Sequence, residues 1–100
     1  MKEKIVLNII EDILCLIGEH VEKYPHHKNS CDFLSGKYNE IREALESNNK
    51  TLIELIEWNK WFAPRIVFEG IGDKNLLIKI EELNLALTQS PTQMIFNGTK

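Results

Sequence analysis

The chain has 100 residues, of which 43% are hydrophobic and 27% charged, and its 12 Lys and Arg against 15 Asp and Glu leave a formal net charge of −3. This length and composition indicate one globular domain with a modest but sufficient core. The mildly acidic balance argues against direct nucleic-acid binding, which usually needs a basic stripe, and is compatible with a basic protein partner. Two cysteines are too few for a disulfide scaffold, so we expect free thiols in a cytoplasmic protein.

No segment reaches the roughly 18 uninterrupted apolar residues that a membrane-spanning helix needs, so the sequence predicts no membrane span. The first 20 residues begin basic and apolar, but Glu11 and Asp12 interrupt the apolar run and no small-residue cleavage site follows. We therefore interpret this segment as a helix and not as a signal peptide.

A first helix is predicted over residues 2–23, because apolar residues recur there at the spacing of a broad helix face. These residues are Ile5, Val6, Ile9, Ile10, Ile13, Leu14, Leu16, Ile17, Val21 and Tyr24. Acidic residues occupy the outward side, and Pro25 ends the helix. The segment 25–30 is predicted to be a polar connection.

A second helix is predicted over residues 31–47, with Asn29 or Ser30 as its N-terminal cap. Its core stripe has spacings of four, three and four residues and consists of Leu34, Tyr38, Ile41 and Leu45. The acidic residues outside this stripe are Glu40, Glu43 and Glu46.

A third helix is predicted over residues 52–63. Thr51 and Glu54 have the spacing of a capping box, in which the hydroxyl and the carboxylate satisfy open backbone N–H groups. The apolar face consists of Leu52, Leu55, Ile56 and Phe62. Pro64 ends this helix, because the residue before a proline avoids helical geometry.

The segment 65–70 is β-branched and aromatic but too short to form a sheet, so we interpret it as part of a corner. Gly70 and Gly72 allow positive φ in that corner, and Asp73 is placed to cap a fourth helix over residues 74–88. The apolar residues of the fourth helix are Leu76, Leu77, Ile80, Leu83 and Leu87. Residues 91–100 are predicted to be an irregular tail, in which Met94, Ile95 and Phe96 could pack back on the helices. Short connections favour antiparallel neighbours, so the expected fold is an all-α, antiparallel, four-helix bundle-like domain.

Three kinds of catalytic or cofactor site fit the sequence poorly: a phosphate-binding loop, a metal site and a cysteine nucleophile. The glycine corner lacks the third glycine of a dinucleotide fingerprint and the Lys-Ser/Thr pair of a phosphate loop, and Asp73 would oppose a phosphate. The side chains that could ligate a metal are His20, His26, His27, Cys15 and Cys31, and their spacings match no common metal motif. Cys31 as a nucleophile would need a base held nearby, which sequence cannot show. We expect no metal, no cofactor and no enzymatic activity.

Trp58 and Trp61 lie on neighbouring positions of the third helix, and two roles stay open for them. Both rings could pack along the edge of the core and cover the corner that follows. Alternatively they could anchor an interface, because Trp is over-represented among binding hot spots.

The segment Phe68–Leu76 resembles Phe-x-Gly-Met-Gly-Ser-x-Asn-Asp, a motif of small all-helical immunity proteins from bacterial polymorphic-toxin and contact-dependent growth-inhibition systems. In that family too the motif follows a helix and opens the last one, and the length and acidic balance of the chain are similar. Asp73 stands where the motif has serine, which preserves a cap, and Leu76 stands where it has aspartate.

The resemblance implies a cytoplasmic protein that binds a cognate toxin domain, in first place a nuclease, and covers its active site. An acidic helical surface suits the basic site of a nuclease. The expected contacts are Glu54, Glu57, Trp58, Trp61, Glu69 and Asp73, with Glu11, Glu19 and Glu22 as second choices. The alternatives are a helical adaptor or regulatory subunit of another bacterial complex, which could be a homodimer, and a small metal-dependent or thiol enzyme.

Overall fold

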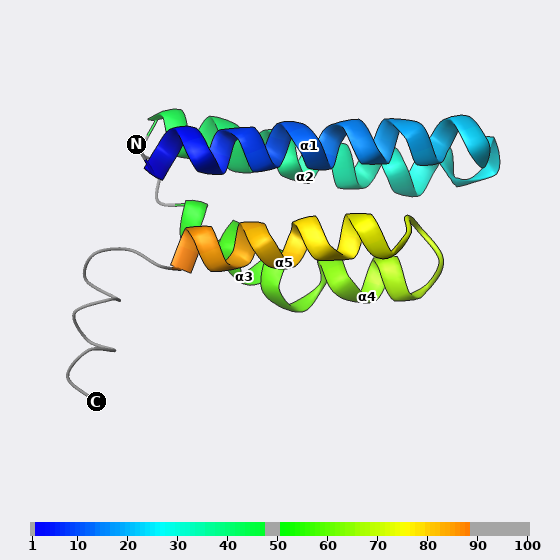
Figure 1. Cartoon of the computed structure of the whole chain (residues 1–100). Coiled ribbons are helices and arrows are strands. Elements are labelled where there is room, and N and C mark those ends of the chain that lie inside the picture. Colours follow the sequence, from blue (N-terminus) through cyan, green and yellow to red (C-terminus); the bar gives the residue numbers. More distant parts are fainter. Residues whose placement is uncertain (1, 48–50, 89–100) are drawn as a thin grey trace.

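The computed structural model describes residues 2–47 and 51–88, all in helices or in the short connections between them (Figure 1). The elements are α1 (Lys2–Lys23), the 3-10 helix η1 (Pro25–His27), α2 (Lys28–Ser47), α3 (Thr51–Trp61), α4 (Ala63–Phe68) and α5 (Lys74–Thr88). No strand occurs within these two ranges, so the predicted all-α class is confirmed. None of the described helices is both long and apolar enough to cross a membrane. The predicted tail 91–100 and the capping side chain of Thr51 lie outside what the structure describes.

The long helices form an up-and-down bundle in two layers. In Figure 1, α1 and α2 lie side by side in one layer, and α5 lies beside α3 and α4 in the other. Each long helix runs opposite to the one before it, with α4 continuing the direction of α3. Contacts join α1 to α2 and α5, and α3 to α2 and α5, so the helices close a four-sided arrangement. This topology is the one that short connections predict.

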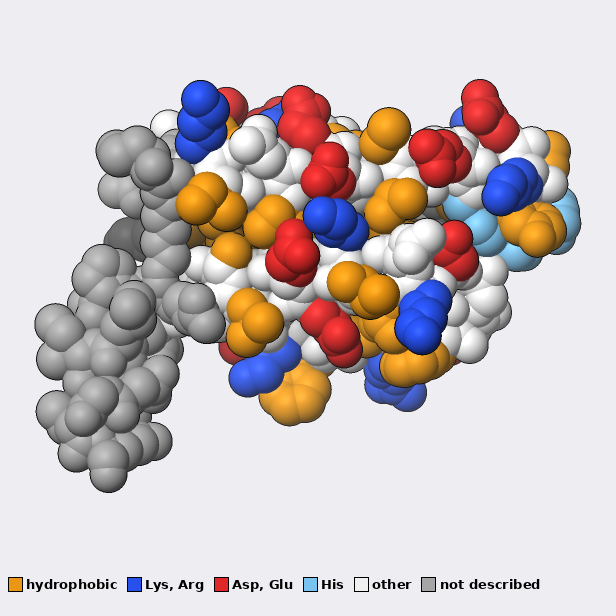
Figure 2. Space-filling view, in the orientation of Figure 1, with side chains coloured by type: hydrophobic (Ala, Val, Ile, Leu, Met, Phe, Trp, Pro, Cys, Tyr) orange, Lys and Arg blue, Asp and Glu red, His pale blue; other side chains and the backbone are white. Residues whose placement is uncertain are grey.

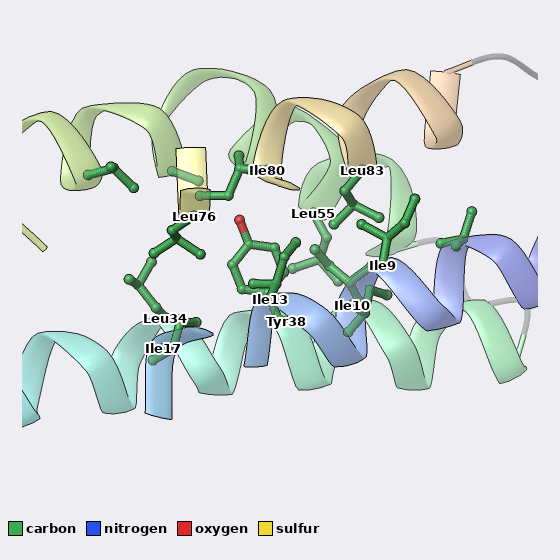
Figure 3. Packing of buried hydrophobic residues seen from close by; sticks show 14 of the residues in the cluster. Ile9, Ile10, Ile13, Ile17, Leu34, Tyr38, Leu55, Leu76, Ile80 and Leu83 are labelled. Atoms are coloured by element: carbon green, nitrogen blue, oxygen red, sulfur yellow. The ribbon is translucent and has the colours of Figure 1, made fainter. Parts of the chain in front are cut away.

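The core lies where the apolar stripes of the four long helices face one another (Figure 3). The buried apolar residues are Val6, Ile9, Ile10, Ile13, Ile17, Cys31, Leu34, Tyr38, Ile41, Ala44, Leu55, Ala63, Val67, Leu76, Ile80 and Leu83. Two residues assigned to the stripe of α1, Ile5 and Tyr24, are about half exposed because they lie near the ends of the helix. In α2, Ala44 takes the buried position while Leu45 is only partly buried.

A buried polar chain crosses this core and was not predicted. The hydroxyl of Tyr38 donates to Asn59 Oδ1 at 2.6 Å, and Asn59 Nδ2 donates to the carbonyl oxygen of Ile80 at 3.3 Å. Tyr38 and Asn59 are both fully buried. Burial raises the pKa of Tyr38 far above its usual value, so the hydroxyl stays protonated and acts as a donor. This buried polar chain therefore joins α2, α3 and α5 through groups that are all hydrogen-bonded.

The connection between α1 and α2 is shorter than predicted. Instead of a polar loop over 25–30, Pro25 begins the turn η1 and α2 starts already at Lys28. Tyr24 leaves helical geometry with φ −130° and ψ 75°, while the N–H of Lys28 reaches back to the carbonyl of Pro25. Backbone hydrogen bonds thus carry the chain around the corner, and the prediction that α2 begins near residue 31 behind an Asn or Ser cap was wrong.

The third predicted helix, 52–63, ends two residues early, and a short further helix follows it. Proline has no N–H to continue the ladder, so α3 ends at Trp61 and α4 starts at Ala63, with Pro64 in its first turn. The buried positions Leu55, Asn59, Ala63 and Val67 follow one another every four residues through the junction, which leaves Phe62 beside this stripe and 54% exposed. The assignment of Phe62 to the apolar core face was therefore wrong, and much of the expected corner is the helical turn α4.

The corner between α4 and α5 matches the prediction. Gly70 and Gly72 have φ values of 107° and 103°, which an L-residue rarely adopts. Asp73 Oδ1 accepts a hydrogen bond from the N–H of Leu76 at 3.1 Å and caps α5. This corner brings the start of α5 back toward the end of α1.

Candidate partner-binding surface

A seam between α2 on one side and α3 with α4 on the other is centred on Trp58, and we call it the Trp58 seam. The Trp58 ring meets the rings of Tyr38 and Phe33 edge-on, with centroid distances of 5.4 Å and 6.3 Å. Lys37 Nζ lies 5.9 Å from the centre of the Trp58 ring and 5.7 Å from that of Phe33. Trp58 is thereby held on its inner side by the buried tyrosine while its outer side lines the surface.

One end of the Trp58 seam is acidic. A hollow of about 470 Å³ lies there between α2 and α3. Its walls are Lys37, Glu40, Glu43, Ala44, Ser47, Glu54, Leu55 and Trp58. Glu40, Glu43 and Glu54 are all exposed, and none of them forms an ion pair with another described residue. Among the described residues of this hollow, three carboxylates stand against one ammonium group, a balance that attracts a cationic partner.

The other end is apolar and aromatic. A hollow of about 360 Å³ is lined there by Phe33, Trp58, Phe62, Arg65, Ile66 and Glu69. Phe33 and Phe62 are both about half exposed. Arg65 and Glu69 balance each other in charge, so this end offers mainly apolar area. Half-exposed aromatic rings are typical anchors of protein interfaces.

The structure separates the predicted contacts into three places. Glu54, Trp58 and Glu69 all line the Trp58 seam. Glu57 and Trp61 lie outside its two hollows and bond to each other, with Trp61 Nε1 donating to Glu57 Oε1 at 3.2 Å. Trp61 is 58% exposed, so of the two tryptophans only Trp58 packs against the core.

The third place is the end of the bundle, where Asp73 and Glu19 line a hollow of about 360 Å³ with His20, His27 and Tyr24. His20 Nε2 and His27 Nδ1 are 2.8 Å apart and share a hydrogen bond. Burial, and then the charge of His27, lower the pKa of His20. Figure 2 shows histidine side chains gathered at this end of the molecule.

The α1–α5 face carries charges of both signs (Figure 2). Lys79 Nζ lies 3.3 Å from both Asp12 and Glu82. Among the second-choice contacts, Glu11 lies 3.8 Å from Arg42 and Glu22 is exposed on α1. Because its charges alternate and pair, this face is less polarised than the Trp58 seam.

The described residues include no group of three or more His, Cys, Asp or Glu side chains that could hold a metal ion. Cys15 is an exposed free thiol and Cys31 a buried one. Burial, followed by the nearby Asp32 carboxylate, raises the pKa of the Cys31 thiol, which disfavours the thiolate that a nucleophile needs.

Comparisons with protein-family models, with curated proteins and with solved structures found no match for this chain. The site is therefore described from its own geometry. Sequence reasoning missed Phe33 and Phe62 as surface aromatics. Phe33 lies next to Leu34 and outside the core stripe, which was a readable signal, whereas Phe62 lies beside the buried stripe that Leu55, Asn59 and Ala63 form in the packed bundle.

Proposed function

We propose that this chain is an immunity protein, which binds a cognate toxin domain in the cytoplasm and silences it by covering the active site. The observation that carries the proposal is the Trp58 seam, where an acidic hollow and an aromatic hollow meet at one tryptophan. The likeness of Phe68–Leu76 to the immunity-protein motif supports the same class.

The chemistry favours a nuclease as the toxin. A nuclease site is basic because it holds phosphates, so carboxylates can occupy it in place of RNA or DNA. Glu40, Glu43 and Glu54 supply that charge, and Trp58 supplies apolar area beside it. Inhibition by occlusion needs no catalytic group, and long-range attraction between the opposite charges speeds the encounter.

The test is to co-express the chain with the toxin domain encoded beside its gene and to titrate the purified pair by calorimetry. We expect a one-to-one complex of nanomolar affinity, with a partner that is toxic alone and silent when bound. Absence of binding, or a neighbour without toxicity, would refute the proposal.

Glu54→Lys tests the surface itself. Close charge pairs at interfaces couple by about 1.5–7 kcal/mol, so reversal is expected to weaken binding at least tenfold. Glu57→Lys on the same helix shows whether the interface extends beyond the seam. Glu81→Lys, at an exposed position of α5, is the matched control and should leave the affinity within about twofold, since isolated surface charges far from an interface contribute little.

A second function, a helical adaptor that pairs with its own copy, is favoured by one feature. Phe33 and Phe62 leave the apolar end of the seam open to another apolar surface. Light scattering of the chain alone over a wide concentration range distinguishes the two functions. A mass that doubles with concentration favours the adaptor, and a constant monomer mass favours the immunity protein.

A further inference from the structure

We infer that the Trp58 seam receives one α-helix of the partner, apolar at one end and basic at the other. The inference deepens the proposed function, on which it rests for the identity of the partner. The two ends of the seam differ in chemistry while sharing the wall of Trp58. An occupant that satisfies both ends must therefore be polarised along its length.

The seam has the length of a short helix. On α2 its lining residues run from Phe33 to Ser47, fourteen positions apart. At about 1.5 Å per residue this is about 21 Å, or roughly four helical turns. The aromatic hollow meets α2 at Phe33, and the nearest carboxylate of the acidic hollow, Glu40, lies about 10 Å farther along α2 by the same rise, which is two turns of a bound helix. Apolar anchors and cations of the partner are thus expected about seven residues apart.

A helix suits this seam better than an extended strand. A strand that docks by its main chain needs a sheet edge with unpaired N–H and C=O groups. The walls of the seam are α-helices, whose backbone groups are bonded within each helix. A docked helix likewise satisfies its own backbone and needs only side-chain complementarity, as amphipathic helices do in apolar grooves.

The charges fix which end of the occupant is basic. Glu40, Glu43 and Glu54 attract cations at the end near Ser47. Lys37 lies over the aromatic rings at the junction and repels cations from the apolar end. At the apolar end Arg65 and Glu69 leave no net charge. The expected partner helix therefore presents Phe or Leu beside Phe33 and Phe62, and Lys or Arg two turns away.

The probe is a synthetic 18-residue helical peptide with Phe and Leu on one face of its first two turns and Lys on the same face of its last two. One control peptide has Glu in place of Lys, and a second has the same composition in scrambled order. The full chain carries Trp61→Phe, so that Trp58 is its single tryptophan and reports binding by fluorescence. We expect saturable binding of the first peptide and at least tenfold weaker binding of both controls.

Two protein variants test the two ends separately. Phe62→Ala removes an exposed aromatic ring and Glu54→Lys reverses a seam charge, and each is expected to weaken peptide binding at least fivefold. Glu81→Lys should change it less than twofold, and circular dichroism confirms that each variant keeps its helices. Equal binding of all three peptides, no fluorescence change with any of them, or equal binding by all three variants would overturn the inference.

The same variants, titrated with the toxin domain, distinguish the failure of this inference from failure of the proposed function. Peptide binding without toxin binding supports the polarised seam and refutes immunity. Toxin binding that is lost with Glu54→Lys and Phe62→Ala, without any selectivity among the peptides, supports immunity and refutes the polarised helix. Toxin binding that neither variant changes refutes the seam as the docking site.

Discussion

The buried polar chain gives the sharpest prediction, because the substitution Tyr38→Phe removes only one oxygen. The hydroxyl of Tyr38 donates to Asn59 Oδ1 at 2.6 Å, and neither side chain is exposed. Its removal leaves a buried acceptor without a donor from Tyr38, which costs about 1–3 kcal/mol. Taking about 2 kcal/mol, the melting temperature of a domain this size should fall by roughly 8–16 °C.

Urea unfolding followed by circular dichroism measures this loss directly. The midpoint should fall while the slope stays unchanged, because the surface exposed on unfolding is the same. A double-mutant cycle with Asn59→Leu tests the pairing, and the double variant should cost at least about 1 kcal/mol less than the sum of the single ones. A loss below about 0.5 kcal/mol for Tyr38→Phe, or additive losses in the cycle, would refute the reasoning. Partner affinity should stay within about twofold, because the phenyl ring still supports Trp58.

Three further predictions concern the glycine corner, the thiols and the histidine pair. Gly72→Ala should destabilise by about 1 kcal/mol or more beyond Gly70→Ala in urea unfolding, because both have positive φ but only at Gly72 would a Cβ overlap a side chain of α5; equal losses would contradict this. Exposed Cys15 should react with Ellman's reagent in the folded protein within minutes, whereas buried Cys31 should react only at the rate of unfolding, and two fast thiols would contradict the assignment. The pKa of His20 is lowered below its ordinary 6.5, so near that pH the folded chain binds fewer protons than the unfolded chain does. The contribution of His20 to stability is therefore complete above about pH 6.5 and is lost as the pH falls below it toward the lowered pKa. His20→Gln should flatten the decline of melting temperature between about pH 7.5 and 5.5, and an unchanged decline would contradict the linkage.

The helices whose bounds could be predicted from the sequence are those with an uninterrupted apolar stripe. α1 and α5 have the predicted bounds, because their ends depend on residues close by in sequence. Pro25 follows the end of α1, and Asp73 caps the start of α5. The start of α2 did not follow, since the backbone bonds of η1 overrode the local preference of Asn and Ser for a cap. Neighbouring residues alone do not reveal such a turn.

The limits of prediction are clearest at Asn59 and Phe62. Asn59 lies four residues after Leu55 and four before Ala63, on the buried stripe, but asparagine is usually a surface residue and its bonding partners lie 21 residues away on either side, so its burial as a bonded polar group did not follow from residue type. Phe62 lies seven residues after Leu55, a spacing that a core position can have, but Ala63 takes the buried place and Phe62 stays exposed. For the candidate site, charge and aromatic content indicated Glu54, Trp58 and Glu69, and the place of Phe33 outside the core stripe was a signal that sequence reasoning missed, while the exposure of Phe62 required the packed bundle.

The break between α3 and α4 leaves a surface that can vary. α4 buries Ala63 and Val67 and packs Ile66 partly against the core, so the side chains that can change without repacking are exposed ones such as Phe62, Arg65 and Phe68. Surface substitutions of this kind usually alter stability by less than about 0.5 kcal/mol. On the proposed function, substitutions at Phe62 and Arg65 therefore change the chemistry of the apolar end of the Trp58 seam, and with it the choice of partner, while the buried residues of α1, α2 and α5 preserve the fold.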